Sequence, residues 1–312
     1  MDKKLYHSVI VCTKDRREDI RNFLYSLIAQ KRRADELLIV DASEQEKGIE
    51  SDVRKIVSGH IDLVKYYKTK PNLAYQKNFA ISKLDMECGV VSFFDDDVVL
   101  EPDYLSSVMD VFERDENKDI GGITGKISNA KDTGKKFIKK IFCLYSSDKG
   151  RILKSGFNVR NLDNMNEPVF IQWMPGGMSS YRKEIFDEFT FDEYYSRNGA
   201  GREDIDFSFK VSQKYKLLFI PEAVLEHKES GVSRISEKQF GYIQVIERYY
   251  FIRRNMDKFI NKLIFFWSIL GVVVINFLSV LLVRKEFKPR IQRLIGNIKG
   301  LKHCFLINYR CK

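Results

Sequence analysis

The chain has 312 residues, of which 44% are hydrophobic and 31% are charged. This composition excludes an intrinsically disordered protein, and the length allows one large α/β domain or two smaller ones. The formal net charge is +10, but nine basic residues and one acidic residue after position 283 give the C-terminal tail a charge of +8. The rest of the chain carries only about +2, so the basic character belongs to the tail.

The start of the chain contains one short apolar patch, residues 9–12, which is too brief for the apolar core of a signal peptide. We therefore expect the chain to begin its existence in the cytoplasm. Five cysteines are scattered along the sequence without a Cys-x-x-Cys pair. This pattern is typical of reduced thiols rather than of a disulfide framework or a zinc site.

Strand-like and helix-like segments alternate in the first third of the chain. Apolar runs predict strands over residues 8–12, 37–40, 61–67 and 90–94, and apolar side chains spaced by three and four positions predict a helix over residues 20–30. This order predicts the α/β class, with a Rossmann-like, mostly parallel sheet flanked by helices. Ligands of such sheets bind at the carboxyl ends of the strands.

Acidic residues follow three of these strands. Asp15 and Asp41 come just after the first and second, and Asp95, Asp96 and Asp97 directly follow the fourth. Three adjacent carboxylates at a strand end repel one another, and a divalent cation is the simplest counter-ion for them. A solvated acidic turn is the alternative. The sequence has no Gly-x-Gly-x-x-Gly motif and no P-loop, which argues against dinucleotide binding and against a P-loop phosphate site.

The order and spacing of several motifs extend this pattern over residues 8–227. The motifs are Val11-Cys12-Thr13-Lys14-Asp15-Arg16, Ile39-Val40-Asp41-Ala42-Ser43, Asn72-Leu73-Ala74-Tyr75-Gln76-Lys77-Asn78, Asp95-Asp96-Asp97, Trp173-Met174-Pro175-Gly176-Gly177-Met178, the segment 182–186, Gly201-Arg202-Glu203-Asp204-Ile205-Asp206-Phe207 and His227. In these motifs the chain resembles family 2 glycosyltransferases, which have the nucleotide-sugar-binding GT-A fold. The resemblance implies a hexosyltransferase-type enzyme that takes a sugar from a nucleotide-diphosphate-sugar donor.

The resemblance also assigns residues to the donor. The positions implied to bind the nucleotide sugar are Thr13, Asp15, Arg16, Asp41, Lys77, Asn78, Asp95 and Asp96. The chain departs from the family pattern at three positions: Asp15 stands where Asn is frequent, Ala42 where a second Asp is frequent, and Lys77 where Arg is frequent.

Transfer from such a donor leaves negative charge on the diphosphate, and a divalent metal held by carboxylates offsets that charge. Asp95 and Asp97 lie on the same side of an extended segment, whereas Asp96 points away, to contact the ribose or to fix the turn. The resemblance adds His227 as a third ligand. Oxygen and imidazole ligands without thiolates favour Mn²⁺ or Mg²⁺ over zinc.

Glu203 and Asp204 begin a predicted helix after a loop that contains glycine. Inverting transfer needs a base opposite the leaving group, and the resemblance implies that Asp204 is this base and that Glu203 binds or orients the acceptor. Trp173 is predicted to stack on an acceptor sugar, with room left by Gly176 and Gly177. The plainer interpretations are helix capping by the two acids and a core position for the tryptophan.

Residues 263–283 contain no ionisable side chain. A helix of this length would be roughly 31 Å long, which matches the hydrocarbon thickness of a bilayer. A buried helix of a soluble protein is the alternative. Basic residues flank the segment on both sides, so orientation stays open: Gly271 and Asn276 mark a break in a re-entrant or interfacial helix, or the segment makes a single pass. The basic tail points to anionic lipid rather than to nucleic acid.

These features predict a catalytic domain over residues 1–256 and a membrane-associated helix with a basic tail over residues 257–312. The catalytic domain would comprise a nucleotide-sugar-binding half, residues 1–128, and an acceptor-binding half, residues 129–256. We expect the protein to act at the cytoplasmic face of the cell membrane on a glycan or a lipid-linked acceptor, in synthesis of a bacterial surface polysaccharide.

Two other functional classes share part of the pattern. A sugar nucleotidyltransferase-like enzyme would have the same sheet and Asp cluster, but it normally needs a basic glycine-rich loop near the first strand, and residues 9–17 contain no glycine. A non-catalytic glycan-binding scaffold would be expected to lack the metal or base residues, and both sets are present. Release of free nucleoside diphosphate on addition of a sugar acceptor separates the three classes.

Overall fold

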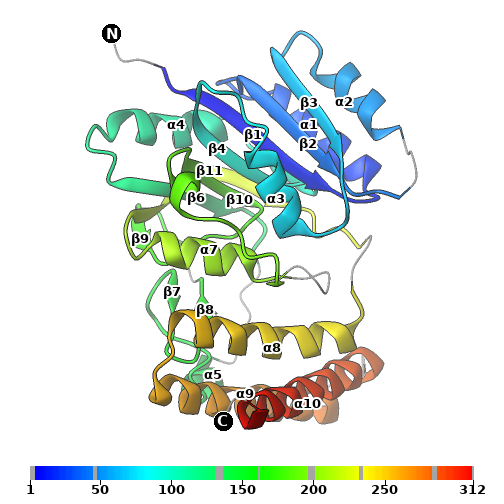
Figure 1. Cartoon of the computed structure of the whole chain (residues 1–312), viewed down its shortest axis with the longest axis vertical. Coiled ribbons are helices and arrows are strands. Elements are labelled where there is room, and N and C mark those ends of the chain that lie inside the picture. Colours follow the sequence, from blue (N-terminus) through cyan, green and yellow to red (C-terminus); the bar gives the residue numbers. More distant parts are fainter. Residues whose placement is uncertain are drawn as a thin grey trace. The chain divides into compact units, whose positions relative to one another are not determined.

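The computed structural model describes residues 4–44, 48–130, 136–160, 162, 164–195, 201–231, 235–282 and 287–310. The chain divides into two compact units (Figure 1). The first comprises Met1–Lys131, Leu162–Ser196 and Glu203–Ser233, and the second comprises Asp132–Asn161, Arg197–Arg202 and Arg234–Lys312.

The first unit is a mixed α/β sheet structure. Its helices are α1 (Arg17–Ile28), α2 (Ile49–Val57), α3 (Leu73–Ile81), α4 (Tyr104–Arg114), α6 (Ile185–Glu188) and α7 (Glu203–Val211). Its strands are β1 (Tyr6–Thr13), β2 (Glu36–Asp41), β3 (Leu63–Lys68), β4 (Cys88–Asp95), β5 (Val98–Leu100), β6 (Ile120–Ile127), β9 (Val169–Ile171), β10 (Met178–Arg182) and β11 (Lys216–His227). Among the described residues, these strands form one sheet in the order β3-β2-β1-β4-β10-β6-β11-β5, with β9 paired to β11.

The first four strands are parallel, as the alternation of strands and helices predicts. β10 is antiparallel to both β4 and β6, and β11 is parallel to β6 but antiparallel to β5 and β9. The predicted strands and the predicted first helix are confirmed, with ends that differ by one to three residues. The predicted α/β fold class, with a central sheet flanked by helices, is therefore confirmed, and the sheet is parallel through its first four strands and mixed beyond them.

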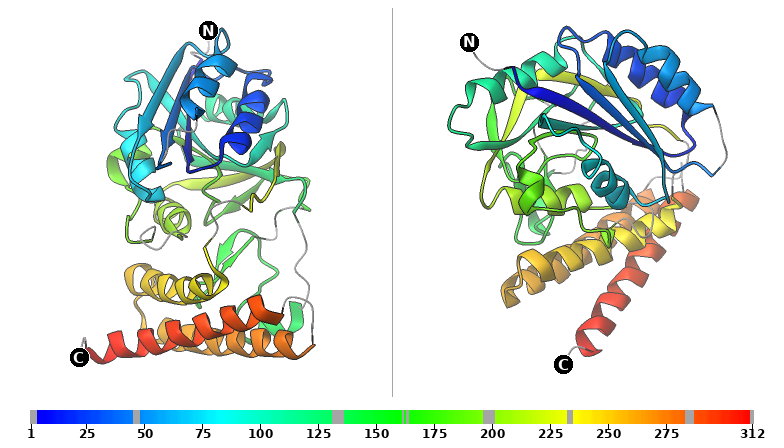
Figure 2. Two further views of the ribbon diagram at one scale, coloured as in Figure 1. Left: turned by 90° about the vertical axis from the view of Figure 1, so that its right-hand side faces the viewer. Right: turned by 45° about the horizontal axis from the view of Figure 1, so that its top comes forward.

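Burial on both faces explains why the central strands are continuously apolar. In β1, Val9 and Val11 pack in a core with α1, α2 and α4, whereas Ile10 packs in a second core with α3, α6 and α7. The helices thus cover the two faces of the sheet (Figure 2). The second core contains a cluster of aromatic rings in mutual contact, namely Phe93, Tyr181, Phe186, Phe191 and Phe207.

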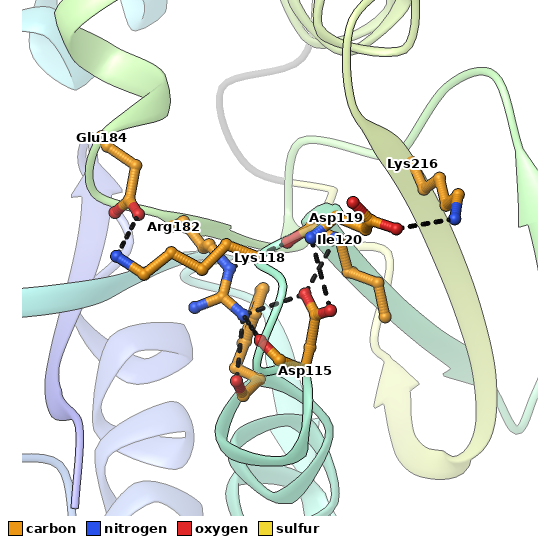
Figure 3. Close-up of polar contacts among 8 residues, drawn as sticks. Asp115, Lys118, Asp119, Ile120, Arg182, Glu184 and Lys216 are labelled. Atoms are coloured by element: carbon orange, nitrogen blue, oxygen red, sulfur yellow. Dashed lines mark hydrogen bonds and ion pairs between the residues drawn. The ribbon is translucent and has the colours of Figure 1, made fainter. Parts of the chain in front are cut away.

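Arg182, in one of the motifs, lies at the opposite end of β10 from Gly177. It pairs with Val90, while Met178 pairs with Phe94. Its guanidinium donates to the carbonyl of Phe112 and to the carboxylate of Asp115, at 2.9 and 3.0 Å (Figure 3). The segment 182–186 therefore helps to join β10 to α4 rather than to build the site at the other end of the strand.

The second unit consists mostly of helices. Its elements are α5 (Lys136–Ile141), β7 (Arg151–Ile152), β8 (Asn158–Val159), α8 (Glu237–Asn255), α9 (Phe259–Leu282) and α10 (Phe287–Arg310). Within the described residues, α9 is the one helix that is long and apolar enough to cross a membrane, over Phe259–Val280, judged by length and composition.

Of the alternatives for this apolar segment, a break at Gly271 and Asn276 is not found, because α9 is continuous through both residues. Gly271 instead provides space for the ring of Phe142, which a Cβ atom would overlap. Asn276 donates a hydrogen bond to Asn297 of α10 at 2.7 Å.

Cysteines 12, 88, 143 and 304 are free thiols, and Cys311 lies outside the described residues.

Candidate active site

The carboxyl ends of β1, β2 and β4 lie next to one another at one edge of the sheet. In the parallel register, Thr13 pairs with Asp41 and Cys12 pairs with Asp95. β10 runs in the opposite direction, so the turn before it reaches the same edge, where the Asp95 N–H donates to the Gly177 carbonyl at 3.2 Å. This edge therefore brings together side chains from distant parts of the sequence.

Asp95, Asp97 and His227 form a group of potential metal ligands at this edge. One oxygen of each carboxylate and one ring nitrogen all lie within 4.8 Å of one another. His227 ends β11, and its Nε2 atom lies 3.1 Å from Asp97 Oδ1, while the Ser230 N–H donates to Asp97 Oδ2 at 2.9 Å. The sequence predicted this trio as ligands, and the structure places the three residues together.

The pKa shifts of the trio reflect its buried and negatively charged surroundings. Burial raises the pKa of Asp95, which Lys77 opposes only in part. Burial alone would also raise the pKa of Asp97, but hydrogen bonds from His227 and Ser230 lower it overall. The hydrogen bond with Asp97 raises the pKa of His227. Among the described residues no hydrogen bond to the Asp95 carboxylate is found, so its oxygens are available, and the oxygen and imidazole donors fit a divalent cation.

Asp96 points toward β1 and is nearly fully buried. One of its oxygens accepts a hydrogen bond from Thr13 Oγ1 at 2.6 Å, and the other accepts one from Arg16 at 2.9 Å. Arg16 also lies 3.6 Å from Asp97 Oδ2. Burial raises the pKa of Asp96 to about 7, although Arg16 and Thr13 act in the opposite direction. Asp96 therefore fixes the turn after β4 to the end of β1, one of its two expected roles.

Asp41 is a buried anion at the end of β2. Its carboxylate accepts hydrogen bonds from the backbone and hydroxyl of Ser43, from Tyr66 and from Lys68, at 2.5–2.7 Å. Burial alone would raise the pKa of Asp41, but these donors, led by Lys68, lower it. Asp15 has a φ of 60° and donates its N–H to Ser43 Oγ at 2.8 Å, which joins the turns after β1 and β2.

Lys68 and Tyr66 were missed by the sequence reasoning. Both lie in β3, and the parallel register pairs Asp41 with Lys68. The sequence did hold a signal for Lys68. If β2 and β3 are taken as neighbouring parallel strands, the basic residue that ends β3 is expected to contact the acidic residue that ends β2.

Lys77 occupies the centre of the site. It lies in α3, which begins after Asn72, whose side chain accepts a hydrogen bond from the Tyr75 N–H. The Lys77 ammonium is buried and donates to Glu203 Oε1 at 3.0 Å. Burial would lower the pKa of Lys77, but the negative charges of Glu203, Asp204 and Asp95 raise it overall.

Asn78, the next residue, holds the chain at Phe191. Its side-chain amide donates to the Phe191 carbonyl at 2.9 Å and accepts from the Phe191 N–H at 3.0 Å. Both polar atoms of the amide are thus used within the protein. Its predicted contact with the donor stays a prediction.

Asp204 lies in the first turn of α7, where the predicted helix begins. Its Oδ2 atom accepts a hydrogen bond from the Gly176 N–H at 2.8 Å, and its Oδ1 atom accepts one from the Ile205 N–H at 2.7 Å. Burial raises the pKa of Asp204 to about 6, and the neighbouring charge of Glu203 adds to this effect. Asp204 therefore combines a fixed position with a pKa close to the neutral range.

The two glycines lie between the carboxylates of the site. A Cβ atom on Gly176 would come within 2.9 Å of the Asp204 Cβ, and one on Gly177 would overlap the carboxylate of Asp95. Glycine is therefore needed here for close approach to acidic side chains. Trp173, at 6% exposure, has little of its indole open to a sugar, and its stacking role stays a prediction.

Comparison with known families matches residues 8–190 to glycosyl transferase family 2. A search of curated proteins found no significant match. Among solved structures, GalNAc-T7 with UDP, GalNAc and Mn²⁺ is 16% identical, with a TM-score of 0.57 over 81% of this chain and 50% of that chain. This chain thus spans half of the GalNAc-T7 chain.

Two further solved structures match over almost the whole chain. The mannosyltransferase PcManGT from Pyrobaculum calidifontis, in complex with GDP-Man and Mn²⁺, is 13% identical with a TM-score of 0.57, covering 96% of this chain and 88% of that chain. Residues 1–349 of TarS from S. aureus are 15% identical with a TM-score of 0.54, covering 95% and 81%. At such low identity, these similarities establish the fold.

Replacing the central cation tests the electrostatics of the site. Lys77→Met removes the charge that Glu203, Asp204 and Asp95 share, so we expect a loss of roughly 3–5 kcal/mol in the free energy of unfolding, as for other broken buried pairs. Urea denaturation measures this loss. Lys118→Met, which breaks an exposed pair with Glu184, is the control and should change stability little. Equal effects of the two substitutions would contradict the central role of Lys77.

Proposed function

Because the chain belongs to glycosyltransferase family 2, we propose that it transfers a sugar, with inversion, from a nucleotide-diphosphate-sugar donor to a glycan or lipid-linked acceptor. The observation that carries this proposal is the arrangement around the Gly176-Gly177 turn. Asp95, of the potential metal trio, lies against Gly177, and Asp204 is bonded to Gly176. The site of the leaving group and the base would thus lie against two adjacent residues of one turn, Gly177 and Gly176.

Asp95, Asp97 and His227 would hold the divalent cation, Mn²⁺ or Mg²⁺. When bound, such a cation stabilises the negative charge of the departing diphosphate. The available carboxylate of Asp95 and the mixed donor set support this assignment. The similar structures of GalNAc-T7 and PcManGT, which contain Mn²⁺, agree with it.

The donor would bind along the ends of β1, β2 and β4. Within the protein, Thr13 and Asp96 bond to each other, and Asp41 is held by four donors, so we propose that these three residues shape the pocket by fixing the strand ends. Arg16, half-buried beside Asp96 and Asp97, is the cation placed to meet the donor's phosphates.

Asp204 would act as the base. Its two N–H donors hold the carboxylate in place while leaving it lone pairs for the acceptor hydroxyl, from which it takes the proton as the sugar is transferred. Glu203 is nearly fully buried against Lys77, so we propose that it positions this cation and adjusts the pKa of Asp204, in addition to any contact with the acceptor.

Family membership favours transfer over the two other classes, a nucleotidyltransferase and a non-catalytic scaffold. Synthesis of a surface polysaccharide at the cytoplasmic membrane face is proposed from the apolar helix α9 and the basic tail.

The division of the chain into domains over residues 1–128, 129–256 and 257–312 stays a prediction. In the structure, residues 132–161 and α8 group with the tail in one compact unit.

Metal dependence is the first test of the proposed chemistry. EDTA should abolish transfer, and Asp97→Ala should lose Mn²⁺-dependent binding of nucleoside diphosphate, measured by calorimetry over a panel of nucleotides. The control is Asp119→Ala, which removes a surface carboxylate paired with Lys216. Full turnover after chelation, or unchanged binding by Asp97→Ala, would refute the metal assignment.

The base assignment predicts that Asp204→Asn retains donor binding but lowers turnover by about 10² or more, the scale of a lost general base. The amide keeps the size of the carboxylate but cannot take the proton. NMR of the product should show an anomeric configuration opposite to that of the donor. Retention of configuration would exclude this mechanism even if Asp204 proved essential.

The pH profile follows from the same residue. Transfer needs the Asp204 carboxylate in its charged form, so turnover should fall as the pH drops below about 6. Glu203→Gln removes a negative charge that raises the pKa of Asp204, and Lys77 then lowers this pKa further. The acid limb of the profile, where turnover falls with falling pH, should therefore move to lower pH. A Glu188→Gln surface variant should keep the original limb. An unshifted limb in Glu203→Gln would contradict the assignment.

A further inference from the structure

Helix α9 turns several polar residues to the inside of the second unit, whereas the large side chains that it exposes are apolar. Asn261, Ser268 and Ser279 are buried. The exposed large side chains of the helix are all apolar, namely Phe259, Ile260, Leu263, Trp267, Leu270, Phe277 and Leu278. A surface helix of a soluble protein shows the reverse arrangement. The outward face of α9 is therefore suited to hydrocarbon rather than to water.

Two polar residues of α9, Ser268 and Asn276, have partners on the neighbouring helices. Ser268 Oγ accepts a hydrogen bond from Arg248 of α8 at 3.1 Å. Asn276 donates to Asn297 of α10, and Asn297 in turn donates to the Gly241 carbonyl of α8 at 2.8 Å. These bonds fix which face of α9 points outward.

Helix α10 runs antiparallel to α9 in contact with it. The rings of Phe266 and Phe305 stack with their centroids 4.7 Å apart, and Asn276 meets Asn297 further along. The two contacts on α9 are ten residues, or about 15 Å, apart. α10 also carries basic residues along its length, including Lys288, Arg290, Arg293, Lys299 and Lys302. If α9 crossed a bilayer, this charged helix would be drawn into the hydrocarbon beside it, at high cost.

Helix α5 extends the apolar surface of the same unit. Phe137 is 77% exposed, and Ile138 and Ile141 are exposed as well. The Trp267 Nε1–H donates to the Ile141 carbonyl at 2.9 Å, and the Trp267 ring packs against Phe142. Apolar side chains from α5 and α9 therefore belong to one surface. Tryptophan is the residue type enriched at the boundary between lipid and water.

Exposed basic residues occur on or next to the same helices. Lys140 lies in α5, Lys258 directly precedes α9, and Lys299 and Lys302 are exposed on α10. Their charge complements that of anionic lipid headgroups, which attract such residues within about a Debye length.

We propose that α9 lies in the plane of an anionic bilayer, with its outward side chains and those of α5 inserted at the headgroup boundary and with α10 beside it at headgroup level. This placement rests on the membrane location proposed above and deepens it, because the chain would be held on one side of the bilayer and would not span it. Both ends of α9 would then lie on the same side of the bilayer as the first unit.

Vesicle binding tests the surface with the full chain and without donor or metal, so the result does not depend on glycosyl transfer. The protein should float with vesicles of phosphatidylcholine and phosphatidylglycerol, and less with phosphatidylcholine alone. Leu263→Glu/Leu270→Glu should lower the bound fraction at least tenfold without changing the melting temperature or nucleotide binding. The control Met86→Glu, a fully exposed apolar residue of the first unit, should bind vesicles normally. Unchanged binding by the double variant would overturn the proposal.

Depth measurement separates an in-plane helix from a spanning one. The chain has two tryptophans, so Trp173→Phe leaves Trp267 as the single fluorophore. Adding Trp267→Phe and Leu278→Trp moves the fluorophore eleven residues along the same face, about 16 Å. Quenching by lipids brominated at different depths should place both positions equally shallow. A depth difference near 16 Å between the two fluorophores would show that the helix spans the bilayer. Dimerisation of the chain through this face without binding to vesicles would show a protein interface. Either result refutes the proposal.

Discussion

The buried ammonium of Lys77 allows three carboxylates from distant parts of the chain to share one site. Asp95 ends β4, and Glu203 and Asp204 begin α7. Their charges repel one another, and burial makes each charge still more costly. The ammonium donates to Glu203 and lies in the field of all three acids, so it offsets much of this cost. Burial nevertheless keeps the pKa of Asp204 raised to about 6, because Lys77 lowers it only in part.

The same arrangement constrains the backbone. The Gly176-Gly177 turn passes between the carboxylates so closely that any side chain on Gly177 would overlap that of Asp95. The close approach lets the backbone bond to both sides, through the Gly176 N–H to Asp204 and the Gly177 carbonyl to the Asp95 N–H. Rigid backbone dipoles thus position the acidic side chains, which favours a fixed geometry before any substrate binds.

The sequence predicts those parts of the site that depend on local pattern. The apolar run before Asp95 marks a strand, and the carboxyl ends of parallel strands meet at one edge, so the placement of Asp95 and Asp41 at that edge follows from periodicity. Pairing is harder to predict, because it depends on register and side-chain direction. The contact of Asp41 with Lys68 follows only once β2 and β3 are taken as neighbours, and that of Glu203 with Lys77 is not visible in the spacing of the residues. The family resemblance supplied His227, for which a lone histidine after a strand gave no independent signal.

The second unit shows a different limit of sequence reasoning. Hydropathy averaged over residues 263–283 reports that the segment is apolar but does not report which way its few polar residues point. Ser268 and Ser279 are eleven residues apart, close to three helical turns, so they share one face with Asn261 and mark the inward side. Only the packing against α8 and α10 shows that this polar face is the buried one. The side chains that this helix leaves exposed are therefore known only from the packing, and the same packing places the basic residues of α10 on a neighbouring helix.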